Sequence, residues 1–179
     1  IVLATILAPY IAPYDPLKQN LTSMLKPPSS QHFFGTDELG RDVFSRILYG
    51  GRISLSLTLA CAFVSAIISV GLGVLSAVGS SWLDTAVGRI ADVQLAVPTM
   101  IIAIVLLTFA GNSLLILSVV MVLSGWVTAY RIIRAQARII IVQSYIDAAK
   151  LAGANTWDIV VRHILPGVLP ITIVAVTIN

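Results

Sequence analysis

Charged side chains are absent from long stretches of this sequence, and that pattern dominates the chain. The first charge-free stretch covers residues 53–83. Because a helix needs about 20 apolar residues to cross a bilayer, this stretch predicts a membrane span at about 53–79. Small side chains recur along it every four residues, which favours close packing with another helix, although they could also line a translocation path. These residues are Cys61, Ser65, Ser69, Gly73 and Ala77.

A second charge-free stretch runs from 93 to 130 and is too long for one ordinary span. Gly111-Asn112-Ser113 divides it near the middle, and residues of these types are typical of turns. We therefore predict a tight hairpin of two spans, at about 94–110 and 114–130. The residues before it, Asp84 to Asp92, form a short polar connection in this interpretation.

The two ends of the chain are also apolar. Residues 1–14 are broken by prolines and are too short to cross a bilayer, so we interpret them as the end of a first span. Residues 164–179 begin a further span. The sequence thus predicts an all-α, polytopic α-helical membrane protein, and we expect the chain to be a fragment that lacks part of span one and a sixth span.

Residues 15–52 are more polar and are predicted to form an extracytoplasmic loop. Within this loop, residues 36–49 have apolar side chains at helical spacing and predict an amphipathic helix capped by Thr36 or Asp37. Such a helix could belong to a gate or to a docking surface for a binding protein. The alternative is a purely structural plug.

Residues 131–163 form the second polar segment, between the predicted spans 114–130 and 164–179. It opens with Arg131, Arg134 and Arg138, which favour a cytoplasmic location. Two short helices are then predicted, Tyr145 to Ala152 and Thr156 to Leu165, with Ser144 and Asn155 as their capping residues and Asp147 and Asp158 three positions later. Gly153 lies where the first helix must end.

The composition supports a membrane protein and excludes several classes. Hydrophobic residues make up 58% of the chain and charged residues 11%, far below the soluble average of about 25%. The net charge of +3 is spread over several loops, which argues against nucleic-acid binding. The single cysteine, Cys61, allows no intrachain disulfide.

Candidate chemistry within the chain is sparse. The chain has no phosphate-binding loop of the G-x-x-x-x-G-K-[ST] type, so ATP hydrolysis would have to come from a partner. The predicted spans 53–79, 94–110 and 114–130 contain no Asp, Glu, Lys, Arg or His, which disfavours an ion-coupled carrier or channel without excluding it. Span serines such as Ser118 and Ser124 have no histidine at comparable depth, which disfavours an intramembrane enzyme. His32 and His163 are each isolated in sequence, and a hydrogen-bonding role is preferred over metal binding.

The second polar segment resembles the EAA loop of permease subunits of binding-protein-dependent ABC importers. That pattern is EAA, three residues, G, nine residues, I, one residue and LP. Here Asp147 replaces the usual glutamate, and His163 stands at the isoleucine position, as in the peptide and nickel branch. The residues that the resemblance assigns to contact with an ATPase are Tyr145, Asp147, Ala148, Ala149, Gly153, Ala154, His163, Leu165 and Pro166.

A second motif in the outer loop resembles the signature FGTD..GRD.FSR of the second permease (C type) of dipeptide, oligopeptide and nickel importers. The matching residues are Phe34, Gly35, Thr36, Asp37, Gly40, Arg41, Asp42, Phe44, Ser45 and Arg46. The two motifs occur in the order expected for that family, and the resemblance extends over essentially the whole chain.

The resemblance implies the permease fold of a type I ABC importer and a role as the pathway for peptides or nickel. It implies no enzymatic activity and no cofactor on this chain, since ATP and Mg would bind the partner ATPase. The implied partners are a homologous second permease, two ATP-binding subunits and a soluble or lipid-anchored substrate-binding protein. The implied location is the plasma (inner) membrane of a bacterium or archaeon.

Overall fold

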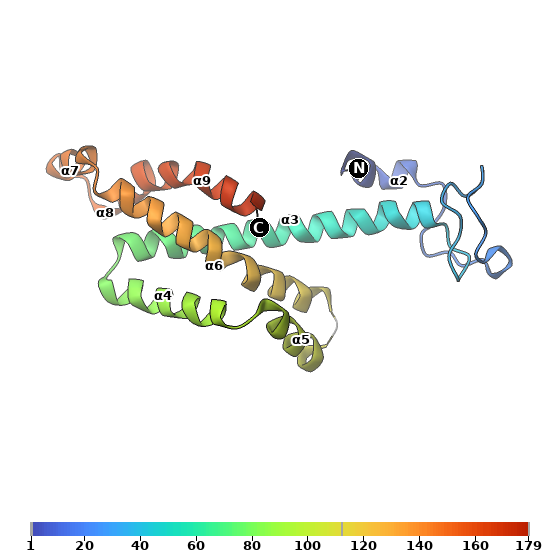
Figure 1. Cartoon of the computed structure of the whole chain (residues 1–179). Helices are drawn as coiled ribbons and strands as arrows, with labels where there is room; N and C mark the ends of the chain where they lie inside the picture. Colours follow the sequence, from blue (N-terminus) through green and yellow to red (C-terminus); the bar gives the residue numbers. More distant parts are fainter. Residues whose placement is uncertain (1, 112, 179) are drawn as a thin grey trace. The chain divides into compact units, whose positions relative to one another are not determined.

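The computed structural model describes residues 2–111 and 113–178, and within these ranges the regular structure is helical (Figure 1). No strand occurs in the described residues, and the nearest approach to one is an isolated bridge between Thr36 and Asp42. This confirms the predicted all-α class. Residues 1 and 179, which fall on predicted spans, and residue 112, which falls on the predicted turn, lie outside the described residues.

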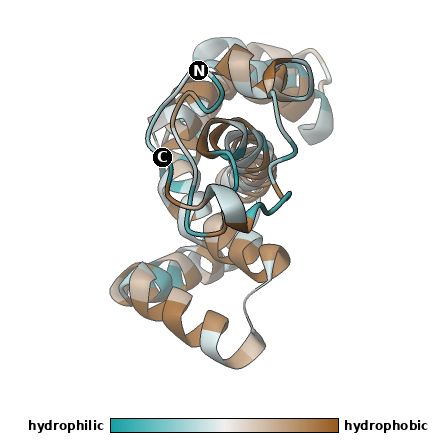
Figure 2. Ribbon diagram, turned by 90° about the vertical axis from the view of Figure 1, so that its right-hand side faces the viewer, coloured by the Kyte–Doolittle hydropathy of each residue, from teal (hydrophilic) through white to brown (hydrophobic). Residues whose placement is uncertain are grey.

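The chain divides into two compact units, residues 1–59 and 60–179. The first unit contains the short elements α1 (Val2–Ile6), α2 (Ala8–Ile11) and η1 (Leu21–Ser23), followed by the first part of α3. The second unit contains the rest of α3 and all later helices. Hydrophobic segments recur along the helices of both units, among paler and hydrophilic ones (Figure 2).

Within residues 2–111 and 113–178, three helices are long and apolar enough to cross a membrane. They are α3 (Val43–Val78), α6 (Leu114–Ile141) and the continuous helical stretch Thr156–Thr177. A fourth candidate is the pair α4 (Ser81–Ala96) and α5 (Thr99–Ala110), which is bent by 85° at a short break. The helices agree with the predicted multi-pass architecture.

The bend between α4 and α5 interrupts the span predicted over 94–110 near its start. Val97 has an extended backbone, with φ −97° and ψ 121°, and Pro98 follows it at the N-cap of α5. A residue before proline is driven out of the helical region by the proline ring, which explains the break. On the other side of the break, the predicted connection Asp84 to Asp92 is helical and lies within α4.

The small-residue stripe of α3 packs against α6. The hydroxyl of Ser65 donates to the carbonyl of Val122 at 3.2 Å and that of Ser69 to the carbonyl of Trp126 at 2.9 Å. The Cys61 thiol approaches the Ser118 carbonyl in the same register. Since both helices advance together along these contacts, α3 and α6 run parallel. The stripe therefore serves helix packing, as the sequence favoured.

Helix α4 runs antiparallel to α6. Asp84, at its start, pairs with Arg134 and Arg138, whereas Asp92 pairs with Arg131 and Gln94 accepts from the Trp126 indole at 2.8 Å. Contacts thus move toward the start of α6 as α4 proceeds. This alternation of direction between α3, α4 and α6 is the one expected of successive crossings.

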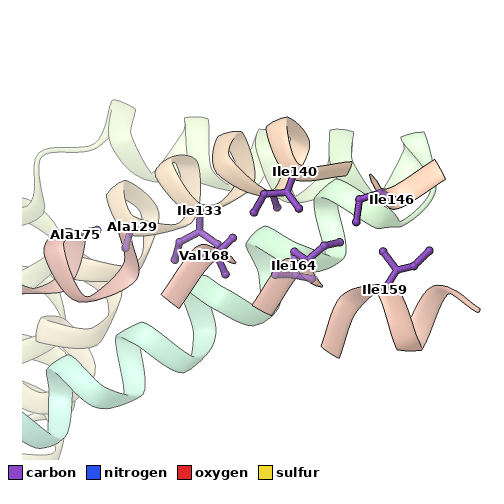
Figure 3. Packing of buried hydrophobic residues seen from close by; sticks show 10 residues of the cluster. Ala129, Ile133, Ile140, Ile146, Ile159, Ile164, Val168 and Ala175 are labelled. Carbon is purple, nitrogen blue, oxygen red and sulfur yellow. The ribbon is translucent and has the colours of Figure 1, made fainter. Parts of the chain in front are cut away.

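Two clusters of buried apolar side chains hold the second unit together. One joins α4 to α6 around Ala91, Val127 and Tyr130. The larger one gathers side chains from α3, α6, α7 (Ser144–Leu151), α8 (Thr156–Ile159), the π-helical turn η2 (Val160–Ile164) and α9 (Leu165–Ile178) (Figure 3). It ties the second polar segment to the membrane-spanning helices.

The helix predicted over 36–49 begins only at Val43 and continues directly into the first long span. Residues 35–42 instead form a tight loop, in which Gly35 and Gly40 have positive φ. Asp42 caps α3, because its Oδ2 accepts from the backbone N–H of Ser45 at 2.8 Å. The prediction of a separate amphipathic helix is therefore wrong on two points. The helix begins at Val43 and not at residue 36, and it is continuous with the span.

The helix predicted to end at Leu165 also continues. Thr156 to Thr177 is one helical stretch, with the π turn η2 in its middle. The N–H of Leu165 donates to the carbonyl of Val160, five residues earlier, and the next residue, Pro166, has no N–H. The wider π-helical turn thus accommodates Pro166, which has no backbone N–H to donate, without ending the helix.

Candidate functional site

Helix α7 is held in place by a single fully buried side chain. Ile146 has no exposed surface and belongs to the cluster that includes Ile140 of α6, Ile159 of α8 and Ile164 of η2 (Figure 3). Isoleucine side chains dominate this end of the cluster. Full burial of one such side chain stabilises the folded state by about 1.5–3 kcal/mol. The helix is therefore packed against both membrane-spanning neighbours and is more than a covalent linker.

The turn after α7 closes the helix with a Schellman motif. Gly153 has φ +91°, and its N–H donates to the carbonyl of Lys150 at 2.9 Å. The N–H of Ala154 donates to the carbonyl of Ala149 at 3.0 Å, which completes the pair of hydrogen bonds that defines the motif. No atom lies within 4 Å of a Cβ built on Gly153, so the backbone conformation alone calls for glycine.

The second half of the segment starts as the sequence predicts. The Asn155 side chain accepts from the backbone N–H of Asp158 at 2.9 Å and caps the helix. At the start of α7 the predicted cap is wrong, because Ser144 is the first helical residue. Gln143 occupies the cap position without a side-chain capping bond. Asp147 instead pairs with Lys150 at 3.2 Å.

The outward side of this segment carries large apolar side chains in contact with solvent. Leu151 is 90% exposed, Trp157 73%, and Tyr145 49%. We call Val142, Tyr145, Leu151 and Trp157 the tip surface. Exposed large apolar side chains are typical of protein–protein contacts where they form one patch.

The structure places the predicted coupling residues in three positions. Tyr145, Asp147 and Ala148 are exposed on α7, and Ala149 is half-buried. Gly153 and Ala154 form the turn. In the following helix His163 and Leu165 are half-buried and Pro166 is exposed. The ring centroids of His163 and Tyr145 lie 5.8 Å apart, so the histidine packs on an aromatic ring. Among the described residues, no three or more His, Cys, Asp or Glu side chains lie together in a way that could hold a metal ion.

Sequence reasoning missed the anchors of this site. Ile146, Ile159 and Ile164 hold α7 and the following helix in place, yet they were absent from the predicted set. Their signal was present as apolar residues at helical spacing between polar ones. Burial of the isoleucines leaves the intervening polar and small residues free for a partner.

The outer-loop signature has a local structural explanation. Asp37 Oδ1 accepts from the backbone N–H groups of Leu39 and Arg41, both at 2.9 Å, and Oδ2 accepts from Arg41 Nε at 2.8 Å. The guanidinium of Arg46 also donates to Asp37. Burial raises the pKa of Asp37, but these hydrogen bonds and the Arg41 charge outweigh it and lower the pKa to about 2.

Asp42 occupies a similar central place in the same loop. It accepts from the Ser45 hydroxyl at 2.8 Å, and its Oδ1 lies 2.9 Å from His32 Nδ1. Burial raises the pKa of Asp42, whereas the hydrogen bonds from Ser45 and His32 lower it below its ordinary value. His32 in turn packs on the Tyr14 ring at a centroid distance of 4.8 Å.

The remaining signature residues also make contacts within the loop. The Thr36 hydroxyl donates to the Ser23 carbonyl, and Phe34 packs edge-on against Phe44 at 5.4 Å. Gly40 has φ +68°, and a Cβ there would lie 1.8 Å from the carbonyl oxygen of Asn20. These contacts give Thr36, Phe34 and Gly40 structural roles within the loop.

Taken together, the long apolar helices, the bent pair α4–α5 as a candidate crossing, and the exposed helix–turn–helix packed on two spans define a polytopic membrane protein of the permease class. Residues 69–179 match the family described as "binding-protein-dependent transport system inner membrane component". The chain belongs to this family, and the resemblance found in the sequence is confirmed.

Several curated relatives are similar over nearly the whole chain. The dipeptide transport system permease protein DppC of Bacillus subtilis (strain 168) is 35% identical over 174 residues, which are 97% of this chain and 54% of the relative. The oligopeptide transport system permease protein OppC of the same organism is 35% identical over 179 residues, 100% of this chain and 59% of the relative. The glutathione transport system permease protein GsiD of Pectobacterium atrosepticum is 36% identical over 161 residues, 89% and 54% respectively. The chain thus spans a little over half the length of these relatives.

Proposed function

We propose that this chain belongs to the transmembrane subunit of an ATP-driven importer and forms part of the pathway for peptides. The names of the relatives support peptides over nickel, since they include dipeptide and oligopeptide permeases. The observation that carries the proposal is the seating of α7, whose inner side is buried and whose outer side carries exposed apolar residues.

In this proposal α7 is the coupling helix, and the tip surface contacts an ATP-binding subunit. A displacement of α7 would be transmitted to α6 and α9, because Ile146 packs in the same cluster as Ile140 and Val168. The helix after the turn is continuous from Thr156 to Thr177, so it can transmit a displacement along its length. ATP-driven approach of two such subunits would then shift the membrane helices between inward and outward access.

The chain would supply no catalytic group and no cofactor site of its own. ATP and Mg would bind the partner ATPase, which fits a permease role without enzymatic activity. The other partners proposed are a second, homologous permease and a soluble or lipid-anchored substrate-binding protein. The proposed location is the plasma (inner) membrane of a bacterium or archaeon.

The test uses the full-length permease expressed with its ATP-binding subunits. Leu151→Asp places a charge on the tip surface at a side chain that is 90% exposed, so the fold should be unaffected. The matched control is Leu17→Asp, at a side chain 77% exposed in the outer segment. We expect Leu151→Asp to lose co-purification of the ATPase and ATP-driven uptake of a labelled dipeptide, and Leu17→Asp to retain both.

Two further variants probe the same contact, namely Asp147→Lys and Gly153→Pro. Retention of the ATPase by Leu151→Asp and Asp147→Lys, with normal membrane insertion, would show that the segment is only a connector. Uptake that proceeds without any ATPase would favour a secondary carrier or channel instead.

A further inference from the structure

A polar pocket of about 520 Å³ opens between α4 and α6. Its charged lining consists of Asp84, Asp92, Arg89, Arg131 and Arg134. Three arginines against two aspartates leave one positive charge in the lining. The pocket is therefore electrostatically suited to an anion.

The two aspartates of this pocket are already paired. Asp84 Oδ1 lies 2.5 Å from Arg134 Nε, and Asp92 Oδ1 lies 2.6 Å from Arg131. The guanidinium of Arg89, by contrast, makes no hydrogen bond or ion pair with any described residue in 2–111 and 113–178. The surplus positive charge of the pocket thus resides on Arg89.

An apolar groove of about 440 Å³ begins at the same arginine. It is lined by Arg89, Ile90, Val93, Gln94, Val97 and Ile102, and so follows α4 into the bend before α5. Ile90 is 60% exposed and Val93 67%, so these side chains are not covered by the described residues. Arg89 lies at the junction of the polar pocket and the apolar groove.

This junction coincides with the boundary between the charged and apolar parts of the two helices. On α4 the last charged residue is Asp92, and on α6 the first is Arg131. Trp82, exposed near the start of α4, is of a type enriched at membrane interfaces. From this pattern of charges we place the pocket at headgroup depth and the groove at acyl-chain depth.

We propose that this junction binds an anionic phospholipid. Arg89, aided by Arg131, would hold the phosphate, because a guanidinium presents a planar pair of donors to phosphate oxygens. One acyl chain would lie in the groove along Val93 and Val97. The continuity of a cationic pocket with an apolar groove distinguishes this ligand from a free phosphate, and basic pockets between helices at the cytoplasmic side are known lipid sites in general. The inference is independent of the proposed transport function.

The test is native mass spectrometry of the full-length permease complex in detergent, titrated with phosphatidylglycerol. We expect one tightly bound lipid and about tenfold weaker binding in Arg89→Gln, with Arg89→Lys intermediate. The matched control is Arg138→Gln, which removes an arginine of α6 that touches Asp84 but does not line the pocket. That variant should bind the lipid as the wild type does.

Three comparisons decide between ligands and positions. Val93→Trp, which fills the groove, should weaken binding, whereas Leu95→Trp, at an exposed position on α4 outside the groove, should not. Phosphatidylethanolamine should bind more weakly than phosphatidylglycerol, and inorganic phosphate should not displace the lipid. Equal binding by wild type and Arg89→Gln would overturn the proposal, as would full displacement by phosphate or burial of the groove by the second permease in the assembled complex.

Discussion

Asp84 and Arg134 form a two-point contact, with Oδ1 to Nε at 2.5 Å and Oδ2 to a terminal guanidinium nitrogen at 2.6 Å. They are 50 residues apart in the chain and join α4 to α6. Arg138 donates to the same carboxylate at 2.6 Å. One aspartate thereby fixes the start of the bent crossing against the helix that leads to α7.

Replacement of this aspartate should loosen α4. Asp84→Asn removes the negative charge that two arginines share, and we expect a loss of about 1.5–3 kcal/mol, seen as a lower midpoint of thermal unfolding of the solubilised full-length protein. The control is Asp92→Asn, whose pair with Arg131 is about half-exposed on both sides and should contribute about 0–1 kcal/mol. Equal effects would contradict the central role of Asp84.

Two glycines of α3 offer a matched pair. A Cβ on Gly73 would lie 2.8 Å from a methyl of Ile133 and 3.2 Å from the backbone nitrogen of Arg134, whereas nothing lies within 4 Å of one on Gly71. We expect Gly73→Ala to destabilise by about 1–3 kcal/mol through overpacking. Gly71→Ala should stabilise by about 0.5–1 kcal/mol through helix propensity. Thermal unfolding of the two variants checks this, and the same sign of shift for both would refute the α3–α6 packing.

The position of α7 depends on the burial of one side chain, Ile146. Ile146→Ala leaves a cavity among α6, α8 and η2, and we expect a local cost of about 2–5 kcal/mol. Backbone amides of α7 should then exchange with solvent hydrogen much faster, because the helix has little else to hold it. Leu151→Ala, at a nearly fully exposed position of the same helix, should leave the exchange rates close to those of the wild type.

The turn at Gly153 should tolerate few residues. Gly153→Ala forces a Cβ into a left-handed conformation at a cost of about 1–2 kcal/mol, and asparagine should cost less because it visits that region more readily. Hydrogen exchange at Ala154 and ATP-driven uptake by the assembled transporter would report the local and functional effects. Identical behaviour of the alanine and asparagine variants would mean that the turn rearranges freely.

The outer loop should weaken only in strong acid. The folded-state pKa of Asp37, about 2, lies below its ordinary value of 3.8, so its stabilising contribution is complete above pH 3.8 and is lost as the pH falls toward 2. The unfolding midpoints of the wild type and Asp37→Asn should therefore differ at pH 5 and converge in that window. A difference that persists unchanged at pH 2 would exclude the ionised carboxylate as its source.

The pattern of charges along the chain was sufficient to predict the class of protein. A run of 31 residues without charge, from Ile53 to Leu83, has no stable place except in a membrane or a large core. The turn at Gly153 and the cap at Asn155 were also predictable, since both depend on local backbone chemistry. The roles of the coupling residues stay predictions until a partner is tested.

Tertiary structure alone decided where the helices begin, bend and meet. The Asp37 and Asp42 side chains fold residues 36–42 into a loop, which delays the start of α3 to Val43 in spite of apolar periodicity. The pairing of Asp84 with Arg134 and the burial of Ile146 join residues far apart in sequence or separated by a turn. The pattern along a short segment predicts whether that segment faces water or lipid. These contacts, in contrast, depend on which distant segments the fold brings together.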